Sequence, residues 1–167
     1  MSPYSPGRGL CVVQARDGTR VCVINLLGQL SLNPSFNPFV QVEELLEQAE
    51  TPVVLIDFHA EATSEKVALA KMLDGRVTAV LGTHTHVQTN DARVLPGGTA
   101  AVTDVGMTGP HDSVIGVQAH LAIERMRTGM PVRFHPSETG VRIEGAVVDC
   151  DPATGRATSC TLLRENF

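Results

Sequence analysis

The stretch TPVVLIDFHAEATSEKVALAKMLDGRVTAVLGTHTH, residues 51–86, carries the clearest secondary-structure pattern of this chain. It begins with a continuously apolar run at 53–58, passes through a helical pattern at 64–73, and ends with a second apolar run at 77–81. Continuously apolar strands are typical of a sheet that is covered on both faces. A strand, a helix and a strand of this length predict a crossover that joins two parallel strands. The stretch therefore predicts an α/β fold.

Histidines follow the carboxyl ends of both predicted strands. His59 comes directly after the first strand, and His84 and His86 follow the second. Ligands of open parallel sheets bind beyond the carboxyl ends of the strands, so we expect the three imidazoles at one edge of the sheet. Neutral imidazole is a common ligand of Zn, Mn, Fe and Co. The pattern therefore predicts a metal site formed by His59, His84 and His86.

His84 and His86 are separated by a single residue. In an extended segment two residues advance by about 6.6 Å and return the side chain to the same face. That interval suits two ions about 3.5–4 Å apart, each bound by one imidazole. The alternatives are solvated or hydrogen-bonded loop histidines, and a single-zinc hydrolase that uses the three imidazoles together.

Acidic side chains near these histidines are candidate partners for the imidazole N–H groups. Asp57, Glu61 and Asp104 have this potential role, because carboxylates commonly orient metal-binding imidazoles. For Glu61 and Glu65 the simpler interpretation is loop capping. His111 lies in a glycine-rich loop that either approaches a phosphate with its N–H groups or simply connects two elements.

Elsewhere the sequence predicts shorter elements. Two β-rich runs flank Asp17-Gly18, a hairpin signal, and a second hairpin is expected around Pro96-Gly97-Gly98. The expected strands are 9–15, 20–27, 93–95, 99–103, 131–135, 141–150 and 157–164, the further helices are 40–49 and 117–128, and 104–116 is a glycine-rich loop. We expect residues 1–167 to form a single domain.

Composition excludes several classes of protein. The 167 residues are 43% hydrophobic and 19% charged, which is typical of a globular chain. A net charge of −5 without a basic cluster argues against a grip on nucleic acid. No apolar run approaches the roughly 20 residues of a membrane span. The four cysteines show no C-x-x-C spacing, and we interpret them as small buried residues of a protein in the reducing cytoplasm.

Three motifs together resemble the YmdB-like family of calcineurin-type metallophosphoesterases. They are DFHAEATSEK at 57–66, LGTHTHVQT at 81–89 and TDVGMTGPHDSVIG at 103–116. The resemblance extends over nearly the whole chain. It implies a metallophosphoesterase-like α-β-β-α sandwich with mixed sheets, and hydrolysis of a small phosphodiester substrate, with 2′,3′-cyclic nucleotides as the substrate class.

The same resemblance implies a dinuclear centre of Fe, Mn, Mg or Zn ions. His59 and His84 would bind one metal and His86 the other, with a hydroxide between the ions attacking phosphorus. Asp104 is a candidate for supporting the ligands or for the phosphate side of the site, and so are Thr108 and Gly109.

The chain also departs from the family pattern. The family's G-D-V-x-G loop, E-N pair and G-N-H loop supply a bridging carboxylate, amide ligands and a proton-donating histidine, and we find none of them in this sequence. The chain therefore resembles the C-terminal part of such an enzyme. We expect an under-ligated site that self-association, or a chain supplying the missing half, completes. The alternative to a phosphodiesterase is a truncated, inactive remnant or interaction domain that retains part of the metal site.

Overall fold

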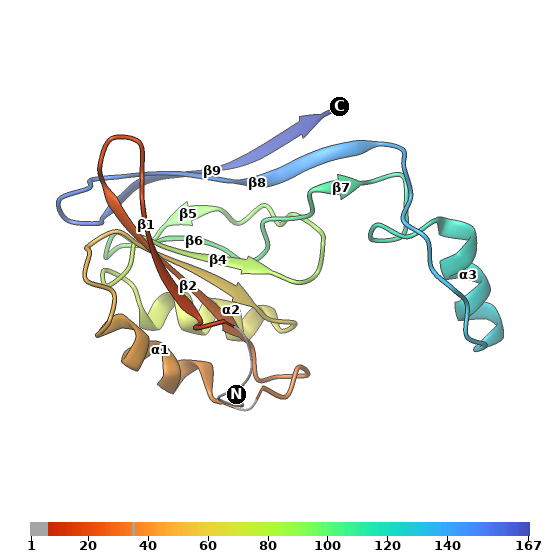
Figure 1. Ribbon diagram of the computed structural model, residues 1–167, viewed down its shortest axis with the longest axis horizontal. Coiled ribbons are helices and arrows are strands. Elements are labelled where there is room, and N and C mark those ends of the chain that lie inside the picture. The colour runs from red at the N-terminus through yellow and green to blue at the C-terminus, as the bar shows by residue number, and fades with distance from the viewer. Residues whose placement is uncertain (1–6, 35) are drawn as a thin grey trace.

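The computed structural model describes residues 7–34 and 36–167. Within these residues the chain forms strands β1 to β9 and helices α1 to α3, arranged in two sheets (Figure 1). No helix in these two ranges is long and apolar enough to cross a membrane.

The larger sheet carries the strands that the sequence predicts around the histidines. Its strands, in spatial order, are β1 (Leu10–Gln14), β2 (Arg20–Leu27), β3 (Val54–His59), β4 (Ala79–Thr83), β6 (Ala100–Val102) and β5 (Arg93–Val94). The four inner strands are parallel, and β1 and β5 pair antiparallel at the two edges. The predicted parallel crossover and both hairpins are confirmed.

Two helices cover one face of this sheet, as Figure 1 shows: α1 (Pro38–Leu46) and α2 (Thr63–Met72). Helix α1 begins two residues earlier than expected, because Asn37 caps it by accepting the N–H of Phe39 and Pro38 occupies the first turn. The core between helices and sheet includes Ile24, Leu26, Ile56, Phe58, Leu69 and Leu73, each at most 2% exposed.

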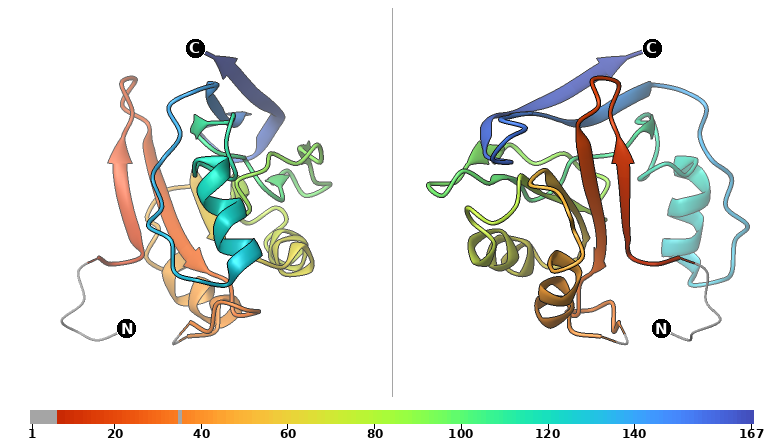
Figure 2. Two further views of the ribbon diagram at one scale, coloured as in Figure 1. Left: turned by 90° about the vertical axis from the view of Figure 1, so that its right-hand side faces the viewer. Right: turned by 60° about the vertical axis from the view of Figure 1, so that its left-hand side comes forward.

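A three-stranded sheet covers part of the opposite face. It consists of β7 (Gly109–Pro110), β8 (Val141–Cys150) and β9 (Ala157–Asn166), and its β8–β9 hairpin crosses the large sheet in both views of Figure 2. Its core against the large sheet is built on Ala79, Ala100 and Ala157, whose small side chains allow a close approach. Toward β1 and β2 this face is open, because Val13 is 50% and Leu27 is 41% exposed.

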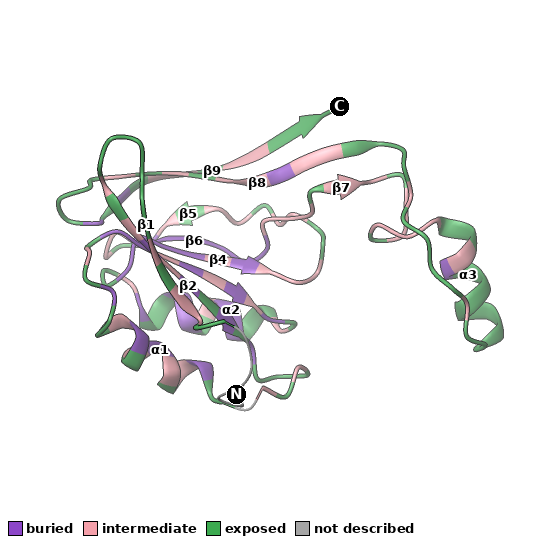
Figure 3. Ribbon diagram, viewed as in Figure 1, coloured by how far each residue is buried: buried purple, intermediate pink, exposed green. Residues whose placement is uncertain are grey.

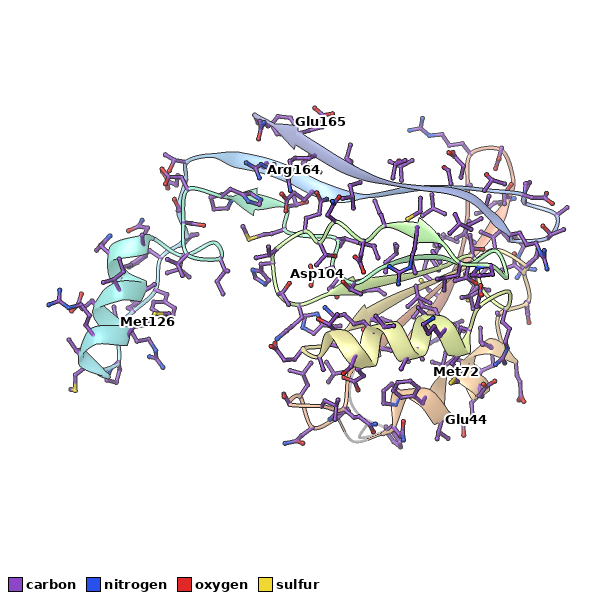
Figure 4. The ribbon with its side chains drawn as sticks, turned by 180° about the vertical axis from the view of Figure 1, so that it is seen from behind. Glu44, Met72, Asp104, Met126, Arg164 and Glu165 are labelled. Carbon is purple, nitrogen blue, oxygen red and sulfur yellow. The ribbon has the colours of Figure 1, made fainter. Side chains whose placement is uncertain are left out.

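Helix α3 (Ala119–Thr128) lies apart from both sheets, with Met126 on its surface (Figures 1 and 4). It ends at Gly129, whose φ of 67° closes the helix. The expected strand at 131–135 is wrong. This segment runs beside α3, where Arg125 lies over the Phe134 ring, and the neighbouring Pro136 makes only an isolated bridge with Val117.

Burial is concentrated in the inner strands and the facing sides of α1 and α2 (Figure 3). Cys22 belongs to this core, and burial raises the pKa of its thiol. Cys150 and Cys160 are half-buried, whereas Cys11 is exposed. The expectation of buried cysteines is therefore wrong for Cys11, which lies on the edge strand β1.

Candidate functional site

His59 and His84 meet at the carboxyl end of the parallel strands. His59 is the last residue of β3, and its register partner Thr83 is the last residue of β4, so His84 follows directly. Nε2 of His59 lies 3.0 Å from Nδ1 of His84, and the two rings meet edge to face with centroids 4.8 Å apart. The sequence expectation that these imidazoles share one edge of the sheet is thus met by the geometry.

A chain of polar side chains fixes the tautomer of His59. Asp57 accepts hydrogen bonds from the Asn25 amide and the Thr83 hydroxyl, each at 2.8 Å. Because the Thr83 hydroxyl has donated its proton to Asp57, it can only accept from Nδ1–H of His59, at 3.2 Å. Nε2 of a neutral His59 therefore carries a lone pair, and that lone pair faces His84.

Glu61 fixes the other imidazole in the complementary way. Nε2 of His84 lies 2.8 Å from the Glu61 carboxylate, and because a carboxylate oxygen can only accept, Nε2 is the nitrogen of a neutral His84 that would carry the proton. Nδ1 of a neutral His84 then also carries a lone pair, directed at Nε2 of His59. Two lone pairs 3.0 Å apart repel unless a cation lies between them, either a proton or a metal ion.

His86 adopts a different place from the one expected. An extended His84–His86 segment is wrong, because β4 ends at Thr83 and the two histidines have φ values of 118° and 63°. The ring of His86 donates through Nδ1 to the main-chain oxygen of Ile115, at 3.2 Å. Its Nε2 is therefore left with the lone pair.

Asp104 anchors the turn that carries these histidines. Its Oδ2 accepts the N–H of Thr85 at 3.0 Å and pairs with Nζ of Lys66 at 3.1 Å. Its main-chain N–H donates to the Thr89 hydroxyl, and its main-chain oxygen accepts the N–H of Thr89. Figure 4 shows Asp104 above α2. It supports the turn and does not touch the His59–His84 pair directly.

Asp91 extends this support along the loop. Burial favours the neutral form of Asp91, but hydrogen bonds from the Thr89 hydroxyl and the N–H of Thr103, together with nearby Arg93, lower its pKa below the ordinary 3.8. The loop after the histidines is therefore held by an ionised carboxylate.

Thr108 and Gly109 lie closer to the smaller sheet than to the histidines. Gly109 pairs with Arg142 of β8, and the Thr108 hydroxyl reaches the main-chain oxygen of Glu144 at 3.5 Å. His111 donates to the main-chain oxygen of Met107 at 3.1 Å, which supports the plain loop interpretation. The structure thus joins Asp104 to the histidine turn and gives Thr108 and Gly109 structural contacts on β8.

A cavity of about 530 Å³ lies beside the histidine pair, one strand away. Its lining includes Arg8, Asn25, Leu27, Phe36 and Gln41. Leu27 is the register partner of His59, and Asn25 is the register partner of Asp57. Two residues that line the cavity on β2 therefore lie directly beside two residues of the site on β3.

Sequence reasoning assigned one residue of this site wrongly and missed three others. Glu61 was expected to cap a loop, but its carboxylate lies 2.8 Å from Nε2 of His84; Glu65 does act as a cap, since it accepts the N–H of Gln29 at 2.6 Å. The contributions of Asn25, Thr83 and Lys66 depend on strand register and helix packing, which no local motif announces.

Among residues 7–34 and 36–167 no three or more His, Cys, Asp or Glu side chains are grouped closely enough to hold a metal ion. His59 and His84 are therefore a pair, with His86 on the same turn. His120 and His135 are exposed and lie away from this pair, on or beside α3.

Known proteins share this sequence and fold. The chain is 50% identical over 155 residues to the 2′,3′-cyclic-nucleotide 2′-phosphodiesterase of Bacillus subtilis (strain 168), covering 92% of this chain and 58% of that protein. A crystal structure of a hypothetical protein from Thermus thermophilus is similar with a TM-score of 0.91 and 38% identity, over 98% of this chain and 64% of that one.

A crystal structure of a phosphatase from Mycoplasma pneumoniae is similar with a TM-score of 0.85 and 36% identity, over 96% of this chain and 58% of that one. The likeness confirms the expected mixed-sheet, metallophosphoesterase-like α/β fold. The chain spans less than two thirds of the length of each of these three relatives. A model of the family described as YmdB-like protein matches residues 1–163, so the chain belongs to the YmdB-like family.

Proposed function

We propose that this chain carries part of the metal centre of a phosphodiesterase. The observation that supports this most strongly is the 3.0 Å contact between Nε2 of His59 and Nδ1 of His84, where the tautomers favoured by their neighbours place two lone pairs. Asp57, through Thr83, and Glu61 hold the two rings in the tautomers that create this arrangement. Carboxylates that orient imidazoles in this way are typical of metal sites.

The donor atoms fit one divalent ion between His59 and His84. Two nitrogens bound at about 2.1 Å and at right angles to each other would lie about 3 Å apart, which matches the separation in the structure. His86, whose Nε2 is left with a lone pair because Nδ1 donates to Ile115, is the proposed ligand of a second ion. Imidazole nitrogen suits Fe, Mn and Zn better than Mg.

A bound divalent metal would supply a Lewis acid that offsets negative charge on the phosphoryl group. The chain's own residues do the remaining work. Glu61 and the Thr83–Asp57 pair keep His59 and His84 oriented, and Asp104 keeps the turn between His84 and His86 in place. Thr108 and Gly109 have no direct role in this proposal, because their contacts are to β8.

The proposed substrate is a 2′,3′-cyclic nucleotide, as in the name of the Bacillus subtilis relative. The cavity beside the histidine pair, of about 530 Å³, is large enough for a nucleoside. Phe36 is 51% exposed and offers a ring on which a base can stack, while Asn25 and Gln41 supply amides for hydrogen bonds. Arg8 contributes a positive charge suited to a phosphate.

The proposal includes a second chain or a second copy that completes the site. Support comes from the open face of β1 and β2, where Val13 and Leu27 are about half exposed. We further place the protein in the cytoplasm, in keeping with four cysteines that are all free.

A second candidate function is a non-catalytic interaction domain that keeps a partial metal site. The observation in its favour is that the described part of the chain brings together two metal-binding side chains, and not three or more. A catalytic zinc site has three protein ligands, so two are a weak basis for catalysis.

Hydrolysis of 2′,3′-cyclic AMP by the purified chain with added Mn²⁺ separates these two candidates. The phosphodiesterase proposal predicts turnover that falls at least about 100-fold in His84→Ala, because the loss removes one of two nitrogens from the ion. The control is His120→Ala, an exposed histidine on α3, which should retain full turnover. No turnover by the parent chain, with Mn²⁺ bound, would favour the interaction domain.

A further inference from the structure

A buried ion pair lies beneath the histidine turn. Nζ of Lys66, on α2, lies 3.1 Å from Oδ2 of Asp104, which follows β6, and the two side chains are 3% and 2% exposed. Buried ion pairs carry a desolvation cost and often add nothing to stability compared with apolar side chains of similar volume. The pair therefore needs a reason other than stability.

We propose that Lys66 and Asp104 are positioning residues, which hold the turn of His84 and His86 in the conformation that binds a divalent metal. The role of the turn in metal binding rests on the proposed function, but the claim that Lys66 and Asp104 hold the turn does not. Neither residue is placed among the metal ligands, and each acts through the turn.

The hydrogen bonds of Asp104 show how it acts. Oδ2 accepts the N–H of Thr85, the residue between the two histidines, at 3.0 Å, and Oδ1 accepts the N–H of Gly106 at 3.0 Å. With both main-chain groups bonded to Thr89, Asp104 ties the histidine turn, its own loop and the segment after the turn to one point. Only a carboxylate offers two oxygens that accept from opposite sides.

The conformation of the turn explains why an anchor is needed. His84 and His86 have φ values of 118° and 63°, in the region that favours glycine and that other residues adopt only under constraint. Without the bond from Thr85 the turn would relax toward ordinary φ values. Nδ1 of His84 would then turn away from Nε2 of His59.

Lys66 reaches Asp104 through a gap that the sequence provides. A Cβ at Gly82 would lie 2.9 Å from Cδ of Lys66 and would overlap the main-chain oxygen of Thr103. The glycine in L-G-T-H-T-H therefore leaves room for the lysine stem beside β4. The ammonium group of Lys66 then offsets the charge of the buried Asp104 carboxylate.

The test compares Lys66→Met with Lys71→Met in the 167-residue chain. Methionine keeps the stem and removes the charge, and Lys71 is an exposed lysine of the same helix, so it is a matched control. In the metal-free protein, ¹⁵N NMR reports the tautomers of the His59 and His84 imidazoles, and hydrogen exchange reports the protection of the N–H of Thr85. We expect the parental imidazole tautomers and the protection of Thr85 to be lost in Lys66→Met and kept in Lys71→Met.

Titration with Mn²⁺ gives the second readout. The affinity should fall about 10- to 100-fold in Lys66→Met, as when a group that orients metal ligands is removed, and should not change in Lys71→Met. If the parent chain binds no Mn²⁺, the proposed function fails, while the metal-free NMR comparison still decides the positioning role. Imidazole signals and Thr85 protection that persist in a folded Lys66→Met chain would overturn it.

A double variant, Lys66→Met with Asp104→Leu, covers the case in which Lys66→Met alone does not fold. An apolar pair of this kind is expected to keep the stability of the chain. A double variant that unfolds like the parent and yet loses the His59–His84 imidazole pattern supports positioning. The same variant with the parental imidazole pattern would overturn the proposal.

Discussion

Glu61 decides which nitrogen of His84 faces His59. Its carboxylate lies 2.8 Å from Nε2, which favours the proton on Nε2 and leaves Nδ1 without one toward the space between the rings. The side chain of Glu61 is 52% exposed, so this contact contributes little to the stability of the fold. Its value lies in the orientation of one ring.

We therefore expect Glu61→Gln to bind Mn²⁺ about 10-fold more weakly while unfolding like the parent chain, because the amide keeps the shape but not the charge that orients His84. Loss of Mn²⁺ signal from free solution, followed by electron paramagnetic resonance, measures this affinity. Glu44→Gln, at an exposed position of α1 (Figure 4), is the control and should change nothing. Equal affinities of Glu61→Gln and the parent would show that Glu61 does not orient the ring.

Asp91 gives the fold a dependence on acid. Its pKa is lowered in the folded chain, so its contribution to stability is full above the unfolded value of 3.8 and is lost as pH falls below it. Thermal unfolding between about pH 6 and about pH 3 should therefore show a steeper loss for the parent than for Asp91→Asn. Parallel curves for the two chains would contradict this assignment.

At the scale of the element, close approach of β4 and the segment that follows β6 depends on one glycine. The Cβ of an alanine at position 82 would overlap the main-chain oxygen of Thr103, so the two parallel strands would have to separate. Strand β4 leads into the histidine turn, and β6 leads through Thr103 to Asp104.

Gly82→Ala should lower the free energy of unfolding by about 3 kcal/mol or more, as an overpacked core does. Urea denaturation measures this change. Gly145→Ala in β8, where a Cβ meets nothing within 4 Å, is the matched control and should stay within about 0.5 kcal/mol of the parent. A Gly82→Ala chain as stable as the control would mean that the strands can separate without cost.

The elements that the sequence predicts correctly are those with a local signal. Continuous apolar runs indicate β3 and β4, and Asp17-Gly18 indicates the first hairpin. The turn of His84 and His86 has no such signal, because its shape comes from Asp104, which lies far along the chain and bonds Thr85. The false strand at 131–135 has the opposite cause: its residues suit a strand, but no neighbouring strand pairs with them in the described part of the chain.

For the candidate site, the sequence groups three imidazoles, of which the structure brings His59 and His84 together and bonds His86 to Ile115, and it does not predict how the pair is held. The meeting of His59 and His84 can be predicted from strand order alone, since the two residues lie at the carboxyl ends of the neighbouring parallel strands β3 and β4. Thr83, Asn25 and Lys66 become part of the site only through register and packing. These contacts join positions far apart in the chain, which a linear pattern does not encode.

At the scale of the whole molecule, the two faces of the large sheet are unequal. The helices cover one face, whereas the β8–β9 hairpin covers the other over β4, β6 and β5 and reaches Leu55 of β3. The open part adjoins the histidine pair, because Leu27 and His59 are register partners. A chain that docks on this face would lie next to the site.

If the chain self-associates through the open face, Val13→Lys should weaken that association. A charge placed there must be desolvated when two copies meet. Sedimentation velocity over a range of concentrations should show association of the parent and at least about a tenfold weaker association of the variant. Val147→Lys, at a similarly exposed valine of β8, is the control. Equal association of both variants and the parent would place the contact elsewhere.

An anomalous diffraction map from a crystal of this chain grown with Mn²⁺ would show directly whether a metal ion lies between His59 and His84. The proposed metal site predicts a peak between Nε2 of His59 and Nδ1 of His84, within bonding distance of both. The absence of such a peak, or a peak on Nε2 of His84 beside Glu61, would contradict it and would mean that a proton, and not a metal, separates the two imidazoles.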